Sequence, residues 1–311
     1  MDKYRISSTG NSINYLPQYI AEHQGFFEEV GLDVETNIPT SWPTVLDEIN
    51  SGDYHAVCGG IWVPSMYQHH SIHEYSCFAK ISSKCPFKLV TREQEIEFDW
   101  KQLEGKSVLV PCDGGASGYI FLKGTLIDKG VNTDKVHFIH DFVDKMLYDG
   151  FTKGNLGDYY FTQASNADQI VSEKKGIVVA EMAKDGIAVP WSIYYSTKEV
   201  AADPRKLNHR FALGIQKGLD WLLTHSGKDV ANILQQRWPK NDVNVGIETV
   251  DRFISEGMWS NSIEIGKTEY ETYGRYQVDA RIIENIVEFE SLVDQSVIDY
   301  VRENTQNGSD N

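Results

Sequence analysis

The first 60 residues alternate between short apolar runs and longer amphipathic stretches, and this order predicts strands alternating with helices. Strands are expected at 4–7, 32–35 and 56–58. Between them, apolar side chains recur three or four positions apart, at Tyr19, Ile20, His23, Phe26, Phe27 and Val30 before a helix end at Gly31, and at Val45, Leu46 and Ile49 after Ser41-Trp42-Pro43. This order implies parallel strands joined by right-handed crossovers.

A second series with the same order begins after Arg92. It comprises a strand at 107–111, a glycine-rich loop, a helix ended by Gly130, further strands at 136–139 and 176–179, and a strand at 191–195 that returns to the first lobe. From Asp203 onward the pattern is helical, with one apolar stripe at Phe211, Ile215, Leu219 and Leu222 and another at Ile282, Ile286, Phe289, Val293 and Val297. We therefore predict an α/β protein.

Composition narrows the class of protein and of partner. The 311 residues are 41% hydrophobic and 24% charged, which suits two domains or two lobes of one folding unit. A net charge of -16 repels phosphate backbones and anionic membranes, so nucleic acid is not an expected partner. The sequence has no run of about 18 apolar residues, so no membrane span is predicted. No secretory leader follows Met1, so we expect a protein of the cell surface or periplasm if a leader was removed, and a cytoplasmic one if Met1 is the native start.

Cysteine and histidine positions give no metal or cofactor motif. Cys58, Cys77, Cys85 and Cys112 form no C-x-x-C pair and no disulfide scaffold, so ordinary thiols are expected. His69 and His73 would lie one turn apart on a helix, but the acid of an H-E-x-x-H site is missing between them. A solvated helix face is the favoured interpretation, and we expect neither a metal nor a cofactor.

Four landmarks in order carry a family resemblance: 16–34 (LPQYIAEHQGFFEEVGLDV), Ile49–Asp53, Leu103–Val108 and Asp203-Pro204. They resemble the solute-binding proteins of ABC importers for sulfonates, taurine, nitrate and thiamine-pyrimidine precursors, together with fungal hydroxymethylpyrimidine phosphate synthase. The resemblance implies a two-lobed, periplasmic-binding-protein-like type II fold that clasps a ligand in the cleft between its lobes. It implies lobe 1 at 1–90, lobe 2 at 91–192, and a return to lobe 1 with C-terminal helices at 193–311, where we expect a disordered tail at 307–311. The implied partners are a small-molecule ligand and, if the protein is exported, a permease and an ATPase.

The loops that follow the predicted strands are the candidate ligand site, because ligands of open α/β sheets lie at the carboxyl ends of the strands. These loops are 9–15, 39–42, 59–62, 112–117 and 140–142. The predicted ligand-binding residues are Asn11, Ser12, Asn14, Tyr15, Trp42, Gly60, Trp62, Asp113, Gly114, Gly115, Ala116, Ser117 and Trp191.

The glycine-rich loop 112–118 is the sharpest of these signals, because backbone N–H groups and a helix N-terminus can bind an oxyanion there. Alternatively, Asp113 or Ser117 only caps the helix and the glycines serve a tight turn. The resemblance favours binding. Neither G-x-x-x-x-G-K-[ST] nor G-x-G-x-x-G is present, so the loop is not a nucleotide loop.

Aromatic rings beside the strand ends could sandwich a planar ligand, at Tyr15, Trp42, Trp62, Phe161 and Trp191, although each ring alone could instead be core packing. Carboxylates at Asp113 and Asp141 favour a ligand with an amino group, and Asp141 is the better candidate for a helix N-cap. The candidate loops contain no arginine. We therefore expect a planar or heteroaromatic ligand such as a thiamine-pyrimidine precursor, with a sulfonate or carboxylate as the second choice.

An enzyme on the same scaffold is the alternative. The fungal synthase requires a lysine and a histidine after the third strand, where this chain has Gly59 and Val63. A related desulfinase uses a cysteine in the first loop, where this chain has 11–14 (NSIN). We therefore assign no catalytic residue and favour a binding protein. The alternative is a cytoplasmic enzyme of thiamine-precursor or sulfur metabolism, with Cys112 as its conceivable nucleophile.

Overall fold

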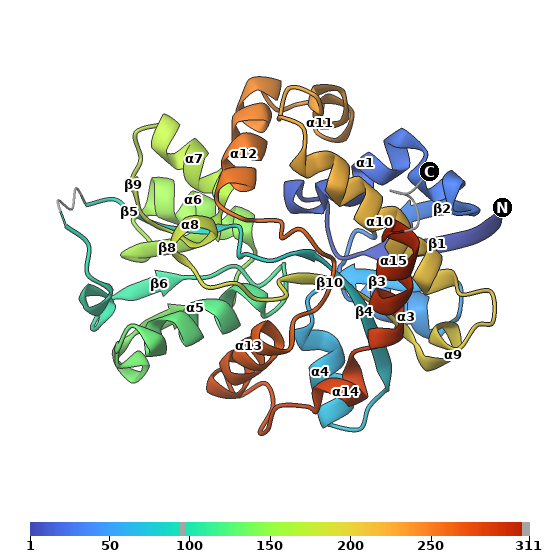
Figure 1. Ribbon diagram of the computed structural model, residues 1–311. Coiled ribbons are helices and arrows are strands. Elements are labelled where there is room, and N and C mark those ends of the chain that lie inside the picture. The colour runs from blue at the N-terminus through green and yellow to red at the C-terminus, as the bar shows by residue number, and fades with distance from the viewer. Residues whose placement is uncertain (94–96, 307–311) are drawn as a thin grey trace. The chain divides into compact units, whose positions relative to one another are not determined.

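The structure is a computed structural model that describes residues 1–93 and 97–306, so the expected tail at 307–311 lies outside the described residues. The chain divides into two compact units. Unit 1 comprises 1–83, 190–271 and 287–311, and unit 2 comprises 84–189 and 272–286. Each unit contains a five-stranded sheet with helices (Figure 1), which confirms the predicted α/β class.

The sheet of unit 1 has the strand order β2-β1-β3-β10-β4. Its strands are β1 (Asp2–Ser8), β2 (Leu32–Asn37), β3 (Ala56–Gly59), β4 (Tyr75–Ser82) and β10 (Ser192–Thr197). The helices that begin in this unit are α1 (Leu16–Gln24), α2 (Phe26–Glu29), α3 (Thr44–Asn50), α4 (Trp62–His69), α9 (Lys198–Ala201), α10 (Leu207–Leu223), α11 (Ala231–Arg237), α12 (Val243–Ser255), α13 (Lys267–Asp279), α14 (Phe289–Leu292) and α15 (Gln295–Gln306), with a 3-10 turn η1 (Ile13–Tyr15). Helix α13 passes into unit 2 at Thr272.

The strand directions in unit 1 bring several strand ends to one edge of the sheet. β1 is parallel to β2 and to β3, as the crossover pattern predicted. β10 is antiparallel to β3 and β4, and its residue Ile193 pairs with Gly59 while Ser192 pairs with Ser82. The ends of β1, β2, β3 and β4 therefore lie at the same edge as the start of β10.

The core of unit 1 is centred on the buried ring of Phe211 in α10. Its ring lies 4.8 Å from Tyr4, 5.0 Å from Phe27 and 4.9 Å from Tyr194, measured between centroids. The Tyr4 hydroxyl donates to Asn208 at 2.8 Å, so the polar end of this buried ring is also satisfied. The predicted stripe on α10 is thus confirmed as a core-facing surface.

Helix α10 packs on α1 and on α15 (Figure 1), and Gly218 lies at its contact with α1. A Cβ atom added to Gly218 would lie 2.2 Å from the carbonyl oxygen of Pro17 and 3.2 Å from the Cβ of Ala21. Because a backbone atom cannot move aside as a flexible side chain can, this crossing requires a residue without a side chain.

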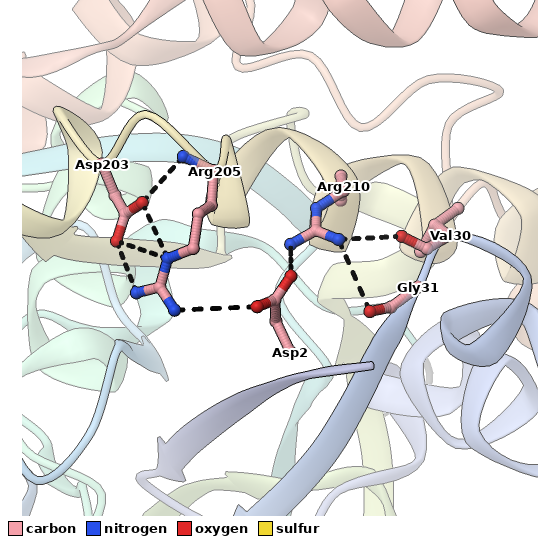
Figure 2. Close-up of polar contacts among 6 residues, drawn as sticks. All are labelled: Asp2, Val30, Gly31, Asp203, Arg205 and Arg210. Carbon is pink, nitrogen blue, oxygen red and sulfur yellow. Dashed lines mark hydrogen bonds and ion pairs between the residues drawn. The ribbon is translucent and has the colours of Figure 1, made fainter.

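An ion-pair network connects the start of β1 with the start of α10 (Figure 2). The Arg205 guanidinium donates to the Asp203 carboxylate and lies 3.7 Å from Asp2, which also pairs with Arg210. Arg210 in turn donates to two carbonyl groups that precede β2, those of Val30 and Gly31. The hydrogen bonds from Arg205 hold the pKa of Asp203 at about 2. The contribution of the Asp203–Arg205 pair to stability is therefore present above the ordinary aspartate pKa and is lost as pH falls through about 2.

The sheet of unit 2 has the order β7-β6-β8-β5-β9. Its strands are β5 (Phe87–Thr91), β6 (Ser107–Leu109), β7 (His137–Ile139), β8 (Tyr159–Gln163) and β9 (Ile177–Glu181), and its helices are α5 (Ser117–Asp128), α6 (Asp144–Gly154), α7 (Ala164–Ser172) and α8 (Met182–Asp185), with 3-10 turns η2 (Trp100–Leu103) and η3 (Thr133–Lys135). β6 is parallel to β7 and β8, whereas β5 is antiparallel to β8 and β9. The ends of β6, β7, β8 and β9 therefore lie at one edge.

Two expected helices differ from the structure. The helix expected to continue to Gly31 breaks at Gly25, whose φ of 77° is left-handed, so α1 and α2 are separate. The stripe from Ile282 to Val297 is not one helix, because it includes α14 and part of α15 together with non-helical residues from 280 to 288. In the described parts of the chain, we find no helix with both the length and the apolar character needed to cross a bilayer.

Replacing Gly218 by Ala tests the α1–α10 contact. In an isolated helix, this change would favour folding by about 1 kcal/mol. Here we expect it to lower the free energy of unfolding by about 1–3 kcal/mol, since the new methyl group overlaps the Pro17 carbonyl. Urea denaturation measures the difference. Gly154→Ala, at the end of α6, is the control, because nothing lies within 4 Å of the added atom. A Gly218→Ala variant as stable as the control would contradict the packing described.

Candidate functional site

The predicted residues of unit 1 come together at the edge where its strands end, and Asn14 is at their centre. The Asn14 amide nitrogen donates to the hydroxyl groups of Ser82 at 3.1 Å and Ser192 at 3.3 Å. Its backbone carbonyl accepts from the Trp259 indole at 2.9 Å, and its side-chain oxygen accepts from Ser12. Asn14 is only 2% exposed, so these bonds fix the loop after β1 against the ends of β4 and β10.

Three hydroxyl residues of this edge were not among the predicted ligand-binding residues, although Thr9 lies in the candidate loop 9–15. Ser82 ends β4, Ser192 begins β10, and Thr9 follows β1. Thr9 donates its backbone N–H to Cys58 at 3.0 Å, and its methyl group would lie 2.9 Å from a Cβ at Gly59. Ser82 could have been found as a residue at the end of a strand, but the strand itself, β4, had not been predicted.

The aromatic residues of unit 1 surround the same edge. Trp42 is half-buried and lies edge-on to Trp62, with ring centroids 5.8 Å apart. Trp62 is the first residue of α4, after the N-cap Ile61, instead of lying in a loop, and is 8% exposed. Tyr15 and Trp191 are 7% exposed. The two tryptophans that follow β2 and β3 are therefore a pair, and part of the Trp42 surface is available to a ligand.

Burial keeps the Tyr15 hydroxyl and the Cys58 thiol at this edge uncharged. Loss of solvation raises the pKa of the Tyr15 hydroxyl, which lies near Thr9, Ser192 and Cys58. Loss of solvation also raises the pKa of the Cys58 thiol to about 12. Both groups are therefore uncharged near neutral pH, and the side chains around Asn14 can offer hydrogen bonds without charge.

Asn11 lies in the first loop and is exposed, in contrast to Asn14. Its side-chain oxygen accepts from the Tyr19 hydroxyl at 2.8 Å, and its amide nitrogen lies 3.4 Å from the carbonyl oxygen of Arg237. The Arg237 guanidinium stacks 4.0 Å above the Tyr19 ring and pairs with Glu22. This cation–π contact holds the far side of the loop on α1.

The glycine-rich loop of unit 2 is a turn with an open helix end. The Gly115 N–H donates to the Cys112 carbonyl at 3.0 Å, and Gly115 has a φ of 71°. A Cβ at Gly114 would meet nothing within 4 Å. Ala116 is the N-cap of α5 and supplies no side-chain capping bond, while Ser117 is the first residue of that helix and is half-buried. The exposed face of this turn therefore leaves room for a ligand beside Gly114.

Asp113 and Asp141 differ from the capping roles considered for them. The Asp113 carboxylate does not cap α5 and instead accepts the backbone N–H of Asp144 at 3.0 Å, at the start of α6. Asp141 is not the N-cap of α6, because that position is Val143 and carries no side-chain cap. Asp144 accepts from Tyr160, Thr162 and Asn166, and its burial raises the pKa of its carboxyl group. Asp113 thus joins the glycine-rich loop to α6.

Two further sequence interpretations need correction. Phe161 is not a ligand candidate, because it is fully buried and packs on Phe87 with ring centroids 5.2 Å apart. His73 does not share a helix with His69, because α4 ends at His69 and Ser71 has a φ of 54°. Within residues 1–93 and 97–306, no group of three or more His, Cys, Asp or Glu side chains could hold a metal ion.

The thiols differ sharply in accessibility. All four cysteines are free, and Cys58, Cys77 and Cys85 are buried, whereas Cys112 is partly exposed. Loss of solvation raises the pKa of each of the three buried thiols. Because the thiolate is the reactive form, only Cys112 combines a thiol with access to solvent.

Thiol labelling tests this difference. At about pH 8, near the ordinary thiol pKa, we expect iodoacetamide to modify one cysteine of the native protein and all four after denaturation. Mass spectrometry counts the adducts. Cys112→Ser should abolish native labelling, whereas Cys85→Ser should leave it unchanged. Rapid modification of Cys58 in the native protein would show that the end of β3 is open to solvent.

Comparisons with known proteins agree with this architecture. Residues 12–228 match the family model described as NMT1/THI5 like. The putative binding protein YtlA of Bacillus subtilis (strain 168) is 26% identical over 312 residues, covering 97% of this chain and 90% of that protein. A solved structure from Bordetella bronchiseptica RB50 has a TM-score of 0.76 at 16% identity and covers 98% of both chains. The putative periplasmic sulfonate-binding protein SsuA of Methylobacillus flagellatus KT has a TM-score of 0.72 at 11% identity, covering 98% of this chain and 95% of that one.

These structures confirm the predicted periplasmic-binding-protein-like type II fold. The family match begins inside the first loop of the candidate site and extends through α10. It spans well over half of the chain and includes all four landmarks, the last of them at 203-204. The chain belongs to the NMT1/THI5-like family.

Proposed function

We propose that this protein is the solute-binding component of an ABC import system and that its ligand is a small planar heteroaromatic molecule, such as a pyrimidine precursor of thiamine. Membership of the family and the fold shared with a sulfonate-binding protein support the general role. The general role is also consistent with the likeness to a putative binding protein from Bacillus subtilis. In this role the protein acts outside the cytoplasm and delivers its ligand to a permease driven by an ATPase.

One observation carries the choice of ligand. At a single edge of the unit 1 sheet, the Trp42–Trp62 pair occurs together with uncharged hydrogen-bonding groups around Asn14. A flat ring can stack on indole, while ring nitrogens and exocyclic groups can bond to neutral hydroxyl and amide groups. The candidate loops carry neither Lys nor Arg, so a strongly charged anion would lack a cationic side chain there.

The glycine-rich loop supports a second contribution from unit 2. Its open turn at Gly114 and the uncapped start of α5 provide backbone donors for an oxygen or ring nitrogen of the ligand. We propose that this loop is itself a ligand contact. This loop also keeps a sulfonate or carboxylate as the second candidate, because backbone N–H groups bind anions without a charged side chain.

The enzyme alternative has less support in the described part of the chain. A nucleophilic cysteine requires a base within hydrogen-bonding reach. The Cys112 side chain has no hydrogen-bond partner among the described residues, and the other three thiols are buried. We therefore retain the binding function as the proposal.

A ligand screen by thermal shift tests the proposed function. We expect 4-amino-5-hydroxymethyl-2-methylpyrimidine to raise the melting temperature more than ethanesulfonate does. A ligand at about 100 times its dissociation constant stabilises the folded state by roughly 2.7 kcal/mol. Stabilisation by ethanesulfonate alone would overturn the choice of ligand class, and conversion of the pyrimidine without any partner would overturn the binding function.

Variants locate the binding surface. Trp62→Ala should remove ring stacking worth roughly 0.5 to 1.5 kcal/mol beyond the area buried. Gly114→Val should block close approach to the backbone without straining the fold, since the space beside Gly114 is open and its φ is not left-handed. Trp221→Ala is the control, because the Trp221 ring lies in α10 and stacks on His225, which follows that helix. Calorimetry should show weaker binding for the first two variants only. Unchanged affinity in both, with lower stability, would make these residues packing and turn positions.

A further inference from the structure

His140 follows β7 at the edge of the unit 2 sheet that also carries the glycine-rich loop. β6 and β7 are parallel and paired up to Leu109 and Ile139, so the residues after them emerge side by side. The backbone N–H of Cys112 donates to the Phe142 carbonyl at 3.1 Å, which ties the two loops together. His140 is therefore placed next to the turn that contains Gly114.

Two contacts fix the orientation of the half-buried His140 ring. Its Nδ1 lies 3.0 Å from the carbonyl oxygen of Val110. Because a carbonyl can only accept, Nδ1 must carry the proton in this bond. The ring also stacks on Tyr119 in the first turn of α5, with centroids 5.1 Å apart and planes inclined by 16°. Tyr119 is itself held by an edge contact with Phe138.

This arrangement sets the chemistry of the other ring nitrogen. With Nδ1 protonated, the neutral imidazole has a free lone pair on Nε2. None of the described residues forms a hydrogen bond with His140 Nε2. One hydrogen bond and one ring contact thus orient the imidazole, while no described residue bonds to its acceptor nitrogen Nε2. Such a group can distinguish a ligand that donates a hydrogen bond from one that only accepts.

We propose that His140 is a ligand-binding residue and that its Nε2 accepts a hydrogen bond from an N–H or O–H group of the ligand. The inference rests on the proposed function and deepens it, since it specifies a donor, such as the amino group of an aminopyrimidine, at this position. A sulfonate has no such donor and would need the protonated ring instead.

The groups around the ring determine how pH acts. The titratable side chains on the elements around His140 are His137 of β7, Tyr119, Lys123 and Asp128 of α5, Cys112 and Asp113 of the glycine-rich loop, and Asp141 and Asp144 after His140. Lys123 lies over the Tyr119 ring, 5.6 Å from its centroid. Because protonation removes the acceptor on Nε2, recognition of a donor requires the neutral ring.

Calorimetry with 4-amino-5-hydroxymethyl-2-methylpyrimidine tests the proposal. His140→Phe keeps a flat ring on Tyr119 and removes both nitrogens, so we expect binding about tenfold weaker, the equivalent of one hydrogen bond. His137→Phe is the matched control, because it makes the same change at an exposed position at the start of the same strand. Urea denaturation of each variant separates lost binding from lost folding.

The pH profile supplies a readout that a structural role would not change. Between about pH 8 and pH 5.5, wild-type affinity should fall more steeply than that of His140→Gln, whose side chain does not titrate. The ligand's own titration is common to both proteins and cancels in the comparison. This measurement also tests the role of His140 if the phenylalanine variant does not fold.

The outcomes are distinguishable. If the pyrimidine binds and both His140 variants match the wild type in affinity and pH profile, the inference fails and the proposed function stands. If wild-type affinity rises relative to His140→Gln as pH falls, the ring acts as a cation and the acceptor role is overturned. If the wild type binds neither the pyrimidine nor ethanesulfonate, the proposed function falls and the inference falls with it.

Discussion

The buried amide of Asn14 is the constraint on which the candidate site of unit 1 depends. It bonds to the hydroxyl groups of Ser82 and Ser192, which lie on two strands far from it in sequence. An unpaired amide in this buried position would cost about 1–3 kcal/mol, so the loop after β1 has one favourable place. Tyr15 and α1 come directly after Asn14 in the chain, so the position of this loop also sets where they begin. The candidate site of unit 1 is therefore held in place by a polar network.

Strands β1, β2, β3, β6 and β7 could be predicted from the sequence, because they alternate with amphipathic helices, and β9 and β10 were predicted as well. Strands β4, β5 and β8 were not. All eight residues of β4 are buried, so the strand shows no alternation between apolar and polar positions. One of them is Lys80, whose charge is compensated by Glu269 far along the chain. The helix break at Gly25 was missed because the helical spacing of apolar residues continues through it, although the backbone of Gly25 is left-handed.

The candidate site was inferred from strand ends, and it was incomplete where β4 had been missed. Ser82 became visible only with β4, whereas Ser192 lies in the predicted strand 191–195 and joins Ser82 through the pairing of β10 with β4. Phe161 had the same sequence signal as Trp62, a ring near a strand end, yet it packs wholly into the core. The two adjacent glycines of the unit 2 loop also look alike in sequence. Only the backbone separates Gly115, which needs its left-handed φ, from Gly114, which does not.

The chemistry of the two units explains why fold alone does not identify the ligand. Backbone N–H groups at a glycine turn donate to an anion, a carbonyl oxygen or a ring nitrogen with little discrimination. Selection must therefore come from side chains, and around Asn14 these are neutral because burial keeps Tyr15 and Cys58 protonated. A neutral surface makes a bare anion give up its hydration without gaining a counter-charge. A planar molecule with several weak donors and acceptors gives up less, and it gains the stacking area that Trp42 and Trp62 provide.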